Sequence, residues 1–300
     1  ISSKTNLVHF GSQYMWVDWH ELLPKGKKYI VTFYHGKPSD GQEVRKHIDN
    51  FIKTERSIFK VTTASSLVHQ RLIEWGIPKS KIEIIPIGVD TKLFSLPSSQ
   101  KKEQIRKKLG FKNNEIIIGS FQKDGQGWDE GNQPKLIKGP DLFVKTIEIL
   151  SKDLPVKVLL TGPARGYVKK ELTKRQIQFV HFYVNSYKEI ANFYNALDLY
   201  IVSSREEGGP KAIVESMASG VPLVSTNVGM ASDFIIDNKN GGLINSFNPE
   251  ELAAKSLKIL MSPYKEELIN EAREDVLRAD WKNVSNLYLE KIYKKSIMNN

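Results

Sequence analysis

The chain has 300 residues, of which 40% are hydrophobic and 26% are charged, and its formal net charge is +10. This length is sufficient for two globular domains with separate cores, and no apolar run approaches the roughly 18 residues that cross a bilayer. The sequence contains no cysteine, which excludes disulfides and thiolate metal sites. The positive charge favours anionic partners, but zinc spacing, an RNP-type aromatic motif and a long basic tract are absent, so we expect no nucleic-acid partner.

Short apolar runs alternate with amphipathic segments along the first third of the chain. A polar helix is predicted over 42–56, and the predicted strands of this region span residues 29–34, 58–62 and 82–85. A polar, proline-bearing segment at 96–100 is predicted to be a linker.

A second series of apolar runs follows this linker, with helical patterns between them. Its predicted strands span residues 115–119, 156–160, 177–182, 199–202 and 222–225. Strands separated by helices indicate βαβ units, so we expect an α/β fold with parallel sheets. The connection at 125–138 is long for such a fold, which predicts a functional or mobile loop.

The most informative stretch follows the predicted strand at 199–202. A Gly-Gly pair at 208–209 predicts a sharp turn, and Pro210 suits the first position of the next helix. Such a junction at the carboxyl end of a parallel strand is where α/β proteins bind phosphorylated ligands. Glu207 and Glu215, which flank the turn eight residues apart, could accept hydrogen bonds from sugar or ribose hydroxyls; two surface glutamates are the alternative.

A lysine and a histidine are further candidates for chemistry. Lys138 stands beside a predicted helix N-terminus, which suits a diphosphate, and Lys123 and Lys135 are nearby alternatives. His35 ends a strand and could face a cleft, although a structural role is the alternative. The chain shows no P-loop, G-x-S-x-G or H-E-x-x-H motif, and its six histidines lack the paired spacing of a zinc site.

Taken together, these landmarks resemble the retaining glycosyltransferases of the GT-B fold, specifically glycosyltransferase family 4 (group 1). The resemblance implies an α/β protein with two Rossmann-like domains facing a cleft. It covers nearly the whole chain and rests on five ordered motifs: Ile85-Pro86-Ile87-Gly88-Val89-Asp90 with Phe94, Lys138-Gly139, Glu207-x7-Glu215, Val228-Gly229-Met230-Ala231 and Asp280-Trp281.

The resemblance implies hexosyl transfer from a nucleotide-diphosphate sugar to a glycan or lipid-linked acceptor, with retained anomeric configuration, no metal and no cofactor. Glu207 would lie near the donor sugar, and His35 would approach that sugar from the N-terminal domain. Glu215 would bind the ribose hydroxyls, and Lys138 would neutralise the departing diphosphate.

The resemblance also implies further donor-binding residues, and some of them depart from the family pattern. Ser120 stands where an arginine usually follows the strand glycine, so the expected substitute is either Lys123 or another cation that the long loop places there. The segment 209–211 replaces the usual Phe-Gly-Leu, and its proline removes a backbone donor. The implied donor-binding residues are Ser120, Lys123, Gly209, Lys211, Gly229 and Met230.

We expect three parts along the chain. Residues 1–98 would form an incomplete, acceptor-side Rossmann-like domain, and 99–279 the donor-binding domain. Residues 280–300 would form a helix that returns to the N-terminal domain. The family's opening strand and glycine-rich loop have no counterpart in the sequence, so the chain alone is expected to be aggregation-prone or inactive.

Two alternatives remain open at this point. One is a GT-B nucleotide-sugar epimerase, and the other is a non-catalytic nucleotide-sugar-binding subunit. For a transferase, we expect a cytoplasmic enzyme of polysaccharide biosynthesis, whose positive charge brings it into peripheral contact with the anionic inner face of the membrane.

Overall fold

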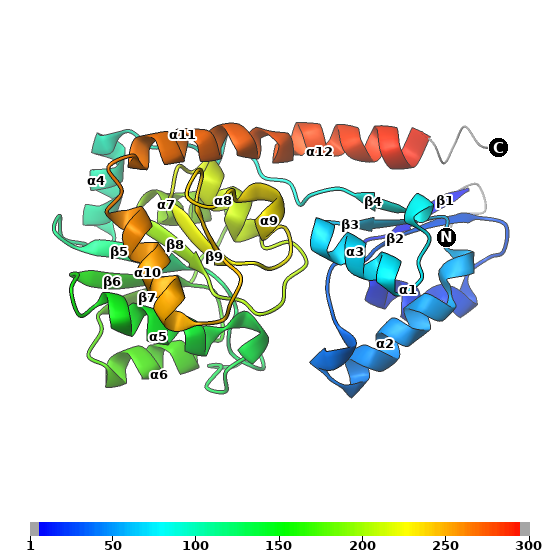
Figure 1. Cartoon of the computed structure of the whole chain (residues 1–300), viewed down its shortest axis with the longest axis horizontal. Helices are drawn as coiled ribbons and strands as arrows, with labels where there is room; N and C mark the ends of the chain where they lie inside the picture. The colour runs from blue at the N-terminus through cyan, green and yellow to red at the C-terminus, as the bar shows by residue number, and fades with distance from the viewer. Residues whose placement is uncertain (1–5, 295–300) are drawn as a thin grey trace.

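The computed structural model of the protein describes residues 6–294, which form two α/β domains, each built on one parallel sheet. The domains lie side by side, and the consecutive helices α11 (Lys265–Val276) and α12 (Trp281–Leu287) together run across both of them (Figure 1). The two sheets confirm the α/β class predicted from the alternation of strands and helices. None of the helices within residues 6–294 combines the length and apolar character needed to cross a membrane.

The smaller domain contains a four-stranded sheet with the order β1-β2-β3-β4. Its elements are β1 (Leu7–Phe10), α1 (Gln13–Trp19), β2 (Lys28–Thr32), α2 (Gln42–Lys53), β3 (Lys60–Thr63), α3 (Ser66–Glu74) and β4 (Ile82–Ile84). Tyr29 and Val31 pack toward the side of the three helices, whereas Ile30 packs on the opposite side. Both faces of the sheet are therefore covered, as the continuous apolar run of a parallel strand requires.

The larger domain contains a six-stranded sheet with the order β10-β9-β8-β5-β6-β7. The strand order reverses between β5 and β8, which makes this position the topological switch point of a doubly wound sheet. Its strands are β5 (Ile116–Ser120), β6 (Val156–Thr161), β7 (Phe179–Phe182), β8 (Leu199–Val202), β9 (Leu223–Thr226) and β10 (Gly242–Ile244).

Helices cover both faces of the larger sheet and bury two apolar clusters against it. They are α4 (Ser99–Lys108), α5 (Pro140–Leu150), α6 (Gly166–Lys174), α7 (Ile190–Asn195), α8 (Lys211–Ala218), α9 (Ala231–Phe234), α10 (Pro249–Leu260) and α11 (Lys265–Val276). The sequence pattern did not single out β1 or β10, because both are short edge strands. The helix α4 also begins inside the segment predicted as a linker, with Ser98 as its N-cap.

The chain crosses back to the smaller domain after α11. There α12 (Trp281–Leu287) continues as a π-helical segment, Tyr288–Lys294. Val284 and Ile292 pack with Ile30 and Ile85 of the smaller domain. Of the predicted N-terminal domain (1–98) and the predicted returning helix (280–300), residues 1–5 and 295–300 lie outside the described residues.

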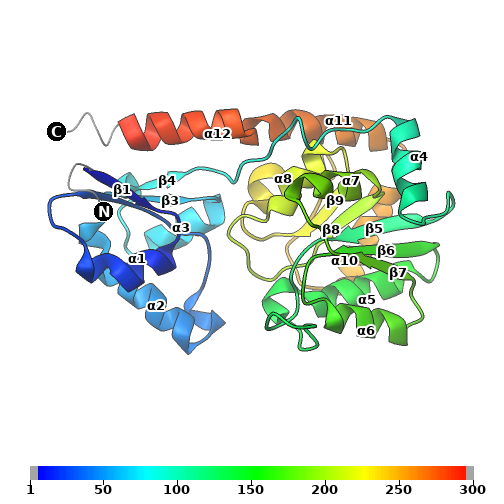
Figure 2. The same cartoon turned by 180° about the vertical axis from the view of Figure 1, so that it is seen from behind.

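Two sequence motifs that are far apart in the chain meet at this crossing. The backbone of Val89 accepts a hydrogen bond from Trp281 N at 3.1 Å and donates one to Ala279 O at 2.9 Å. The Asp280 carboxylate accepts a hydrogen bond from the Thr91 hydroxyl at 2.6 Å. Figure 2 shows the linker and the α11–α12 segment along the same edge of the molecule.

The close packing at this crossing explains the glycine at position 88. A Cβ built there would lie 2.5 Å from the Trp281 ring, whereas one at Gly11 would meet nothing within 4 Å. We therefore expect Gly88→Ala to lower the free energy of unfolding by about 1–3 kcal/mol through overpacking. Denaturant unfolding measures the loss, and Gly11→Ala is the control that should leave stability nearly unchanged. Equal stability of the two variants would contradict this account.

Candidate active site

A cavity of about 480 Å³ opens at the carboxyl ends of β5 and β8, where the strand order reverses. Ligands of doubly wound α/β proteins bind at this position. Of the residues predicted from the sequence, six line this cavity: Lys123, Lys138, Glu207, Gly209, Lys211 and Glu215. Because Lys135 also lines it, we refer to it as the lysine cavity.

An ion pair connects the two loops that border the lysine cavity. Lys138 Nζ lies 2.5 Å from Glu207 Oε1, which also accepts a hydrogen bond from the Ser204 hydroxyl at 2.8 Å. Lys138 directly precedes Gly139, whose left-handed backbone (φ +61°) starts α5. The lysine charge and the N-terminus of α5 therefore lie together, which favours an anion at this point.

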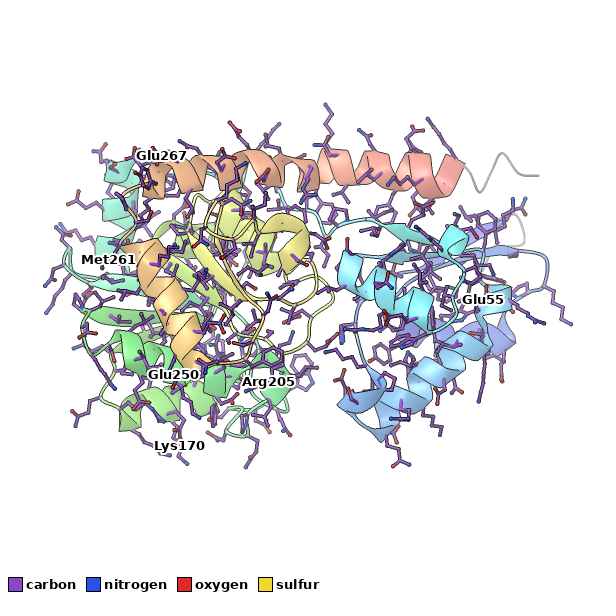
Figure 3. The ribbon with its side chains drawn as sticks, in the orientation of Figure 1. Glu55, Lys170, Arg205, Glu250, Met261 and Glu267 are labelled. Carbon is purple, nitrogen blue, oxygen red and sulfur yellow. The ribbon has the colours of Figure 1, made fainter. Side chains whose placement is uncertain are left out.

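A second ion pair strengthens the connection between these loops. Arg205, labelled in Figure 3, donates two hydrogen bonds of 2.7 Å each to the two Asp141 oxygens in the first turn of α5. The backbone N–H of Arg205 also donates to Ile137 O at 2.8 Å. A bidentate arginine–carboxylate pair fixes orientation as well as distance, so the loop that bears Glu207 is held against the start of α5.

The loop that follows β5, including the long connection predicted at 125–138, places cations beside this ion pair. Lys123 lies 3.4 Å above the centre of the exposed Trp128 ring in a cation–π contact. Burial, together with repulsion from Lys138 and Lys123, lowers the pKa of Lys135, and Glu207 opposes this shift only in part. The cavity therefore gathers more positive charge than its carboxylates neutralise, as expected for a site that receives a polyanion.

Glu215 lies inside the fold and has two tyrosine partners. Its exposed fraction is 6%, and its two oxygens accept hydrogen bonds from Tyr187 at 2.6 Å and Tyr194 at 2.9 Å. Burial and the neighbouring carboxylate raise the pKa of both tyrosines, so they remain protonated donors at neutral pH. The remaining lone pairs of Glu215 can accept hydrogen bonds from ligand hydroxyls.

His35 belongs to the smaller domain and does not line the lysine cavity. The buried Gln13 side chain fixes its loop, since it donates to His35 O at 3.0 Å and accepts from Tyr34 N at 3.2 Å. Desolvation lowers the pKa of His35, while the charge of Glu207 acts in the opposite direction. The imidazole is therefore neutral at pH 7, and it lies close enough to Glu207 for that carboxylate to affect its pKa.

Ser120, which was predicted to bind the donor, is not among the residues that line the lysine cavity. It is 1% exposed, and its hydroxyl and carbonyl accept hydrogen bonds from Arg165. The Arg165 guanidinium is fully buried and lies 3.0 Å from Asp124. This cation is neutralised inside the protein, so it positions the loop after β5 and does not contribute charge to the cavity.

The adjacent glycines Gly208 and Gly209 allow close packing between loops of the two domains. Gly208 and Gly209 do not adopt positive φ, so the sharp turn predicted there is not the reason for them. A Cβ at 208 would lie 2.2 Å from Tyr34 O, and one at 209 would lie 2.7 Å from the Ile87 side chain. Both glycines therefore allow the two domains to approach each other.

The remaining predicted positions are those of Gly229, Met230 and Pro210. Gly229 packs against Gly208, and Met230 is fully buried, so neither residue lines the lysine cavity. Pro210 was predicted as the first helical residue, but it is the N-cap of α8, which begins at Lys211. Within residues 6–294, no three or more side chains of histidine, aspartate or glutamate gather in a way that could hold a metal ion.

Sequence reasoning did not identify Gln13, Tyr187 or Tyr194 as part of this site. No local pattern marks Gln13, because its role depends on a loop that follows it by some twenty residues. The tyrosines lie on a segment whose side chains meet Glu215 only through tertiary packing. Aromatic residues between two predicted strands are too common a signal to distinguish these two from core residues.

The comparisons with known proteins agree with this architecture. Residues 133–275 match the family model described as "Glycosyl transferases group 1". The chain is 24% identical to Spore coat protein SA of Bacillus subtilis (strain 168), over 80% of this chain and 66% of that protein. It is 29% identical to the lipopolysaccharide core biosynthesis mannosyltransferase LpsB of Rhizobium meliloti (strain 1021), over 59% of this chain and 48% of that protein.

Among solved structures, the chain is similar to Anabaena Alr3699/HepE in complex with UDP-glucose. The TM-score is 0.80 at 20% identity, and the match covers 96% of this chain and 79% of that one. The fold is thus of the GT-B class, as the motifs predicted. The family match covers residues 133–275, which contain most of the larger domain, and the structural likeness shows the fold. The matched stretches cover less than two thirds of either curated relative.

The contact between the two cavity loops predicts the effect of a substitution at Gly139. A Cβ there would lie 1.8 Å from the backbone oxygen of Ser203, and φ is +61°. Gly110 has a similar φ of +78° but open space around it. We expect Gly139→Ala to destabilise the protein by about 1–3 kcal/mol more than Gly110→Ala. Thermal unfolding of the two variants measures this difference, and equal losses would show that only backbone strain matters.

The lowered pKa of Lys135 predicts proton uptake when a polyanion binds. An anion raises this pKa back toward its ordinary 10.5, so the complex binds more protons than the free protein. Affinity for inorganic pyrophosphate should therefore fall as the pH rises through the depressed pKa of the free protein. Calorimetry in buffers of different ionisation enthalpy, below the ordinary lysine pKa of 10.5, measures the uptake. Lys135→Gln should abolish it, and unchanged uptake would contradict the assignment.

Proposed function

We propose that the chain is the donor-binding and catalytic part of a retaining, family 4 glycosyltransferase of the hexosyltransferase type. It transfers a sugar from a nucleotide-diphosphate sugar to a glycan or lipid-linked acceptor. The observation that carries this proposal is the 2.5 Å ion pair between Lys138 and Glu207 in a cavity that holds three further lysines. The structure of HepE with UDP-glucose supports a nucleotide-sugar donor.

The proposed chemistry follows from where charge develops. As the glycosidic bond to the diphosphate breaks, negative charge builds on the phosphate oxygens and positive charge on the anomeric carbon. In this proposal Lys138, Lys123 and the N-terminus of α5 stabilise the negative charge on the phosphate oxygens, and Glu207 stabilises the positive charge on the anomeric carbon. Glu215 holds the ribose hydroxyls, so the leaving group is oriented before it departs.

His35 completes the proposed site from the smaller domain. As a neutral imidazole it can accept a hydrogen bond from a hydroxyl of the donor sugar, and it adds no charge that would oppose the cationic anomeric carbon. We propose that the lysine cavity supplies the cations which a divalent metal supplies in other transferases, so no metal is required.

We propose that the protein is cytoplasmic and that it makes peripheral contact with the anionic inner face of a membrane, where the acceptor lies. This part of the proposal rests on the net charge of +10, which attracts the chain to anionic head groups. Vesicles that contain anionic lipid test it by co-sedimentation. Binding that did not weaken with added salt would contradict an electrostatic contact.

The first experiment is a calorimetric titration of UDP, GDP and ADP into the protein. We expect saturable binding of one diphosphate and a loss of at least about tenfold in affinity for Lys138→Ala and for Glu215→Ala, because each removes a charged or hydrogen-bonding contact. Lys170→Ala is the matched control, since it removes the same charge from the exposed outer edge of the larger domain (Figure 3).

Turnover distinguishes an enzyme from a binding subunit. With the matching donor and acceptor, Glu207→Gln should bind the diphosphate but lose most of kcat, because the stabilising charge is gone while the shape is kept. Binding without turnover by the unaltered protein would instead favour the non-catalytic subunit. If none of the three diphosphates binds, both the transferase and the non-catalytic nucleotide-sugar-binding subunit are contradicted.

A further inference from the structure

Glu206, the residue before Glu207, connects the two domains through a buried carboxylate. It belongs to the larger domain, and its exposed fraction is 5%. Its Oε1 lies 2.7 Å from Arg71 Nη1, and its Oε2 lies 2.8 Å from Lys37 Nζ, both in the smaller domain. A second arginine nitrogen donates to Oε2 at 3.3 Å, so the arginine contact is bidentate.

The same arginine also holds the loop that carries His35. Arg71 Nη1 donates a hydrogen bond to Gly36 O at 2.9 Å, one residue after His35. Lys37, the second cation on Glu206, follows in the same loop. One carboxylate therefore fixes the loop of His35 both directly, through Lys37, and indirectly, through the helix residue Arg71.

Other contacts show how tightly the domains meet around this carboxylate. The N–H of Ser66 at the start of α3 donates to Asp233 of the larger domain at 2.9 Å. Gly208 lies so close to Tyr34 O that no side chain fits between them. Burial opposes ionisation of Glu206, but hydrogen bonds from Arg71 and Lys37 overcome this and lower its pKa. The carboxylate is thus charged at neutral pH and excluded from most water.

We propose that Glu206 is a positioning residue: through Arg71 and Lys37 it sets the His35 loop of the smaller domain against Glu207 of the larger one. This role rests on the proposed function of the lysine cavity, since it concerns how that site is completed. Glu206 does not line the cavity, so it acts on the geometry between the domains and not on the binding of the diphosphate. Without its charge, Arg71 and Lys37 face each other as unpaired cations.

The distance between the domains tests this proposal independently of activity. The sequence has no cysteine, so thiols introduced by Glu43→Cys and Lys170→Cys, at exposed positions on α2 and α6, are the sole labelling sites for a fluorescence donor and acceptor. In this background we expect Glu206→Gln to reduce transfer efficiency and broaden its distribution. The matched control Glu250→Gln, an exposed glutamate on α10 labelled in Figure 3, should change neither.

Binding and turnover separate positioning from a general structural role. For Glu206→Gln we expect the Kd for UDP to stay within about twofold, and kcat for UDP release from UDP-glucose to fall by about 10-fold to 100-fold. Glu206→Asp, which keeps the charge, should recover part of kcat. Unchanged energy transfer and unchanged kcat in Glu206→Gln would overturn the proposal. A loss of affinity for UDP, or a lowered Tm large enough to explain the loss of kcat, would overturn it as well. If the unaltered protein binds none of UDP, GDP and ADP, the proposed function fails, and the energy-transfer result alone decides the role of Glu206.

Discussion

The ion pair between Lys138 and Glu207 joins two loops that leave neighbouring strands at the reversal of the sheet order. Opposite charges held 2.5 Å apart resist any shift of one loop past the other, particularly where water is partly excluded. Gly139 permits the close approach, and the Arg205–Asp141 pair repeats the connection a few residues away. A continuous series of charged contacts thus extends from the start of α5 to the interface with the smaller domain.

Much of the fold could be predicted because its causes are local. The strand β8 was expected at 199–202 and occupies Leu199–Val202, since a short apolar run between turn residues has few other stable forms. Lys138, Glu207 and Glu215 were expected near one ligand because their motifs resemble those of family 4 glycosyltransferases. The structure does bring these three side chains to one cavity, while their chemical roles stay predictions.

What the sequence could not reveal depends on residues that are distant in the chain. Gly208 reads as a turn residue until Tyr34 O is seen to occupy the space of its Cβ. Ser120 reads as a missing arginine until the Arg165 guanidinium is found against it, with Asp124 as its counter-ion. In each case the partner lies more than forty residues away, so no periodicity or spacing rule connects the two positions.

The return of α12 to the smaller domain also constrains how the chain folds during synthesis. Ile30 and Ile85 leave the ribosome early, whereas Val284 and Ile292, which cover them, leave near the end of the described chain. Until then one apolar face of the smaller sheet stays open, and such faces attract chaperones and other nascent chains. The larger domain can complete its own core first. The smaller domain therefore completes its core last. A pause in translation before α12 would leave the larger domain folded and one apolar face of the smaller sheet uncovered.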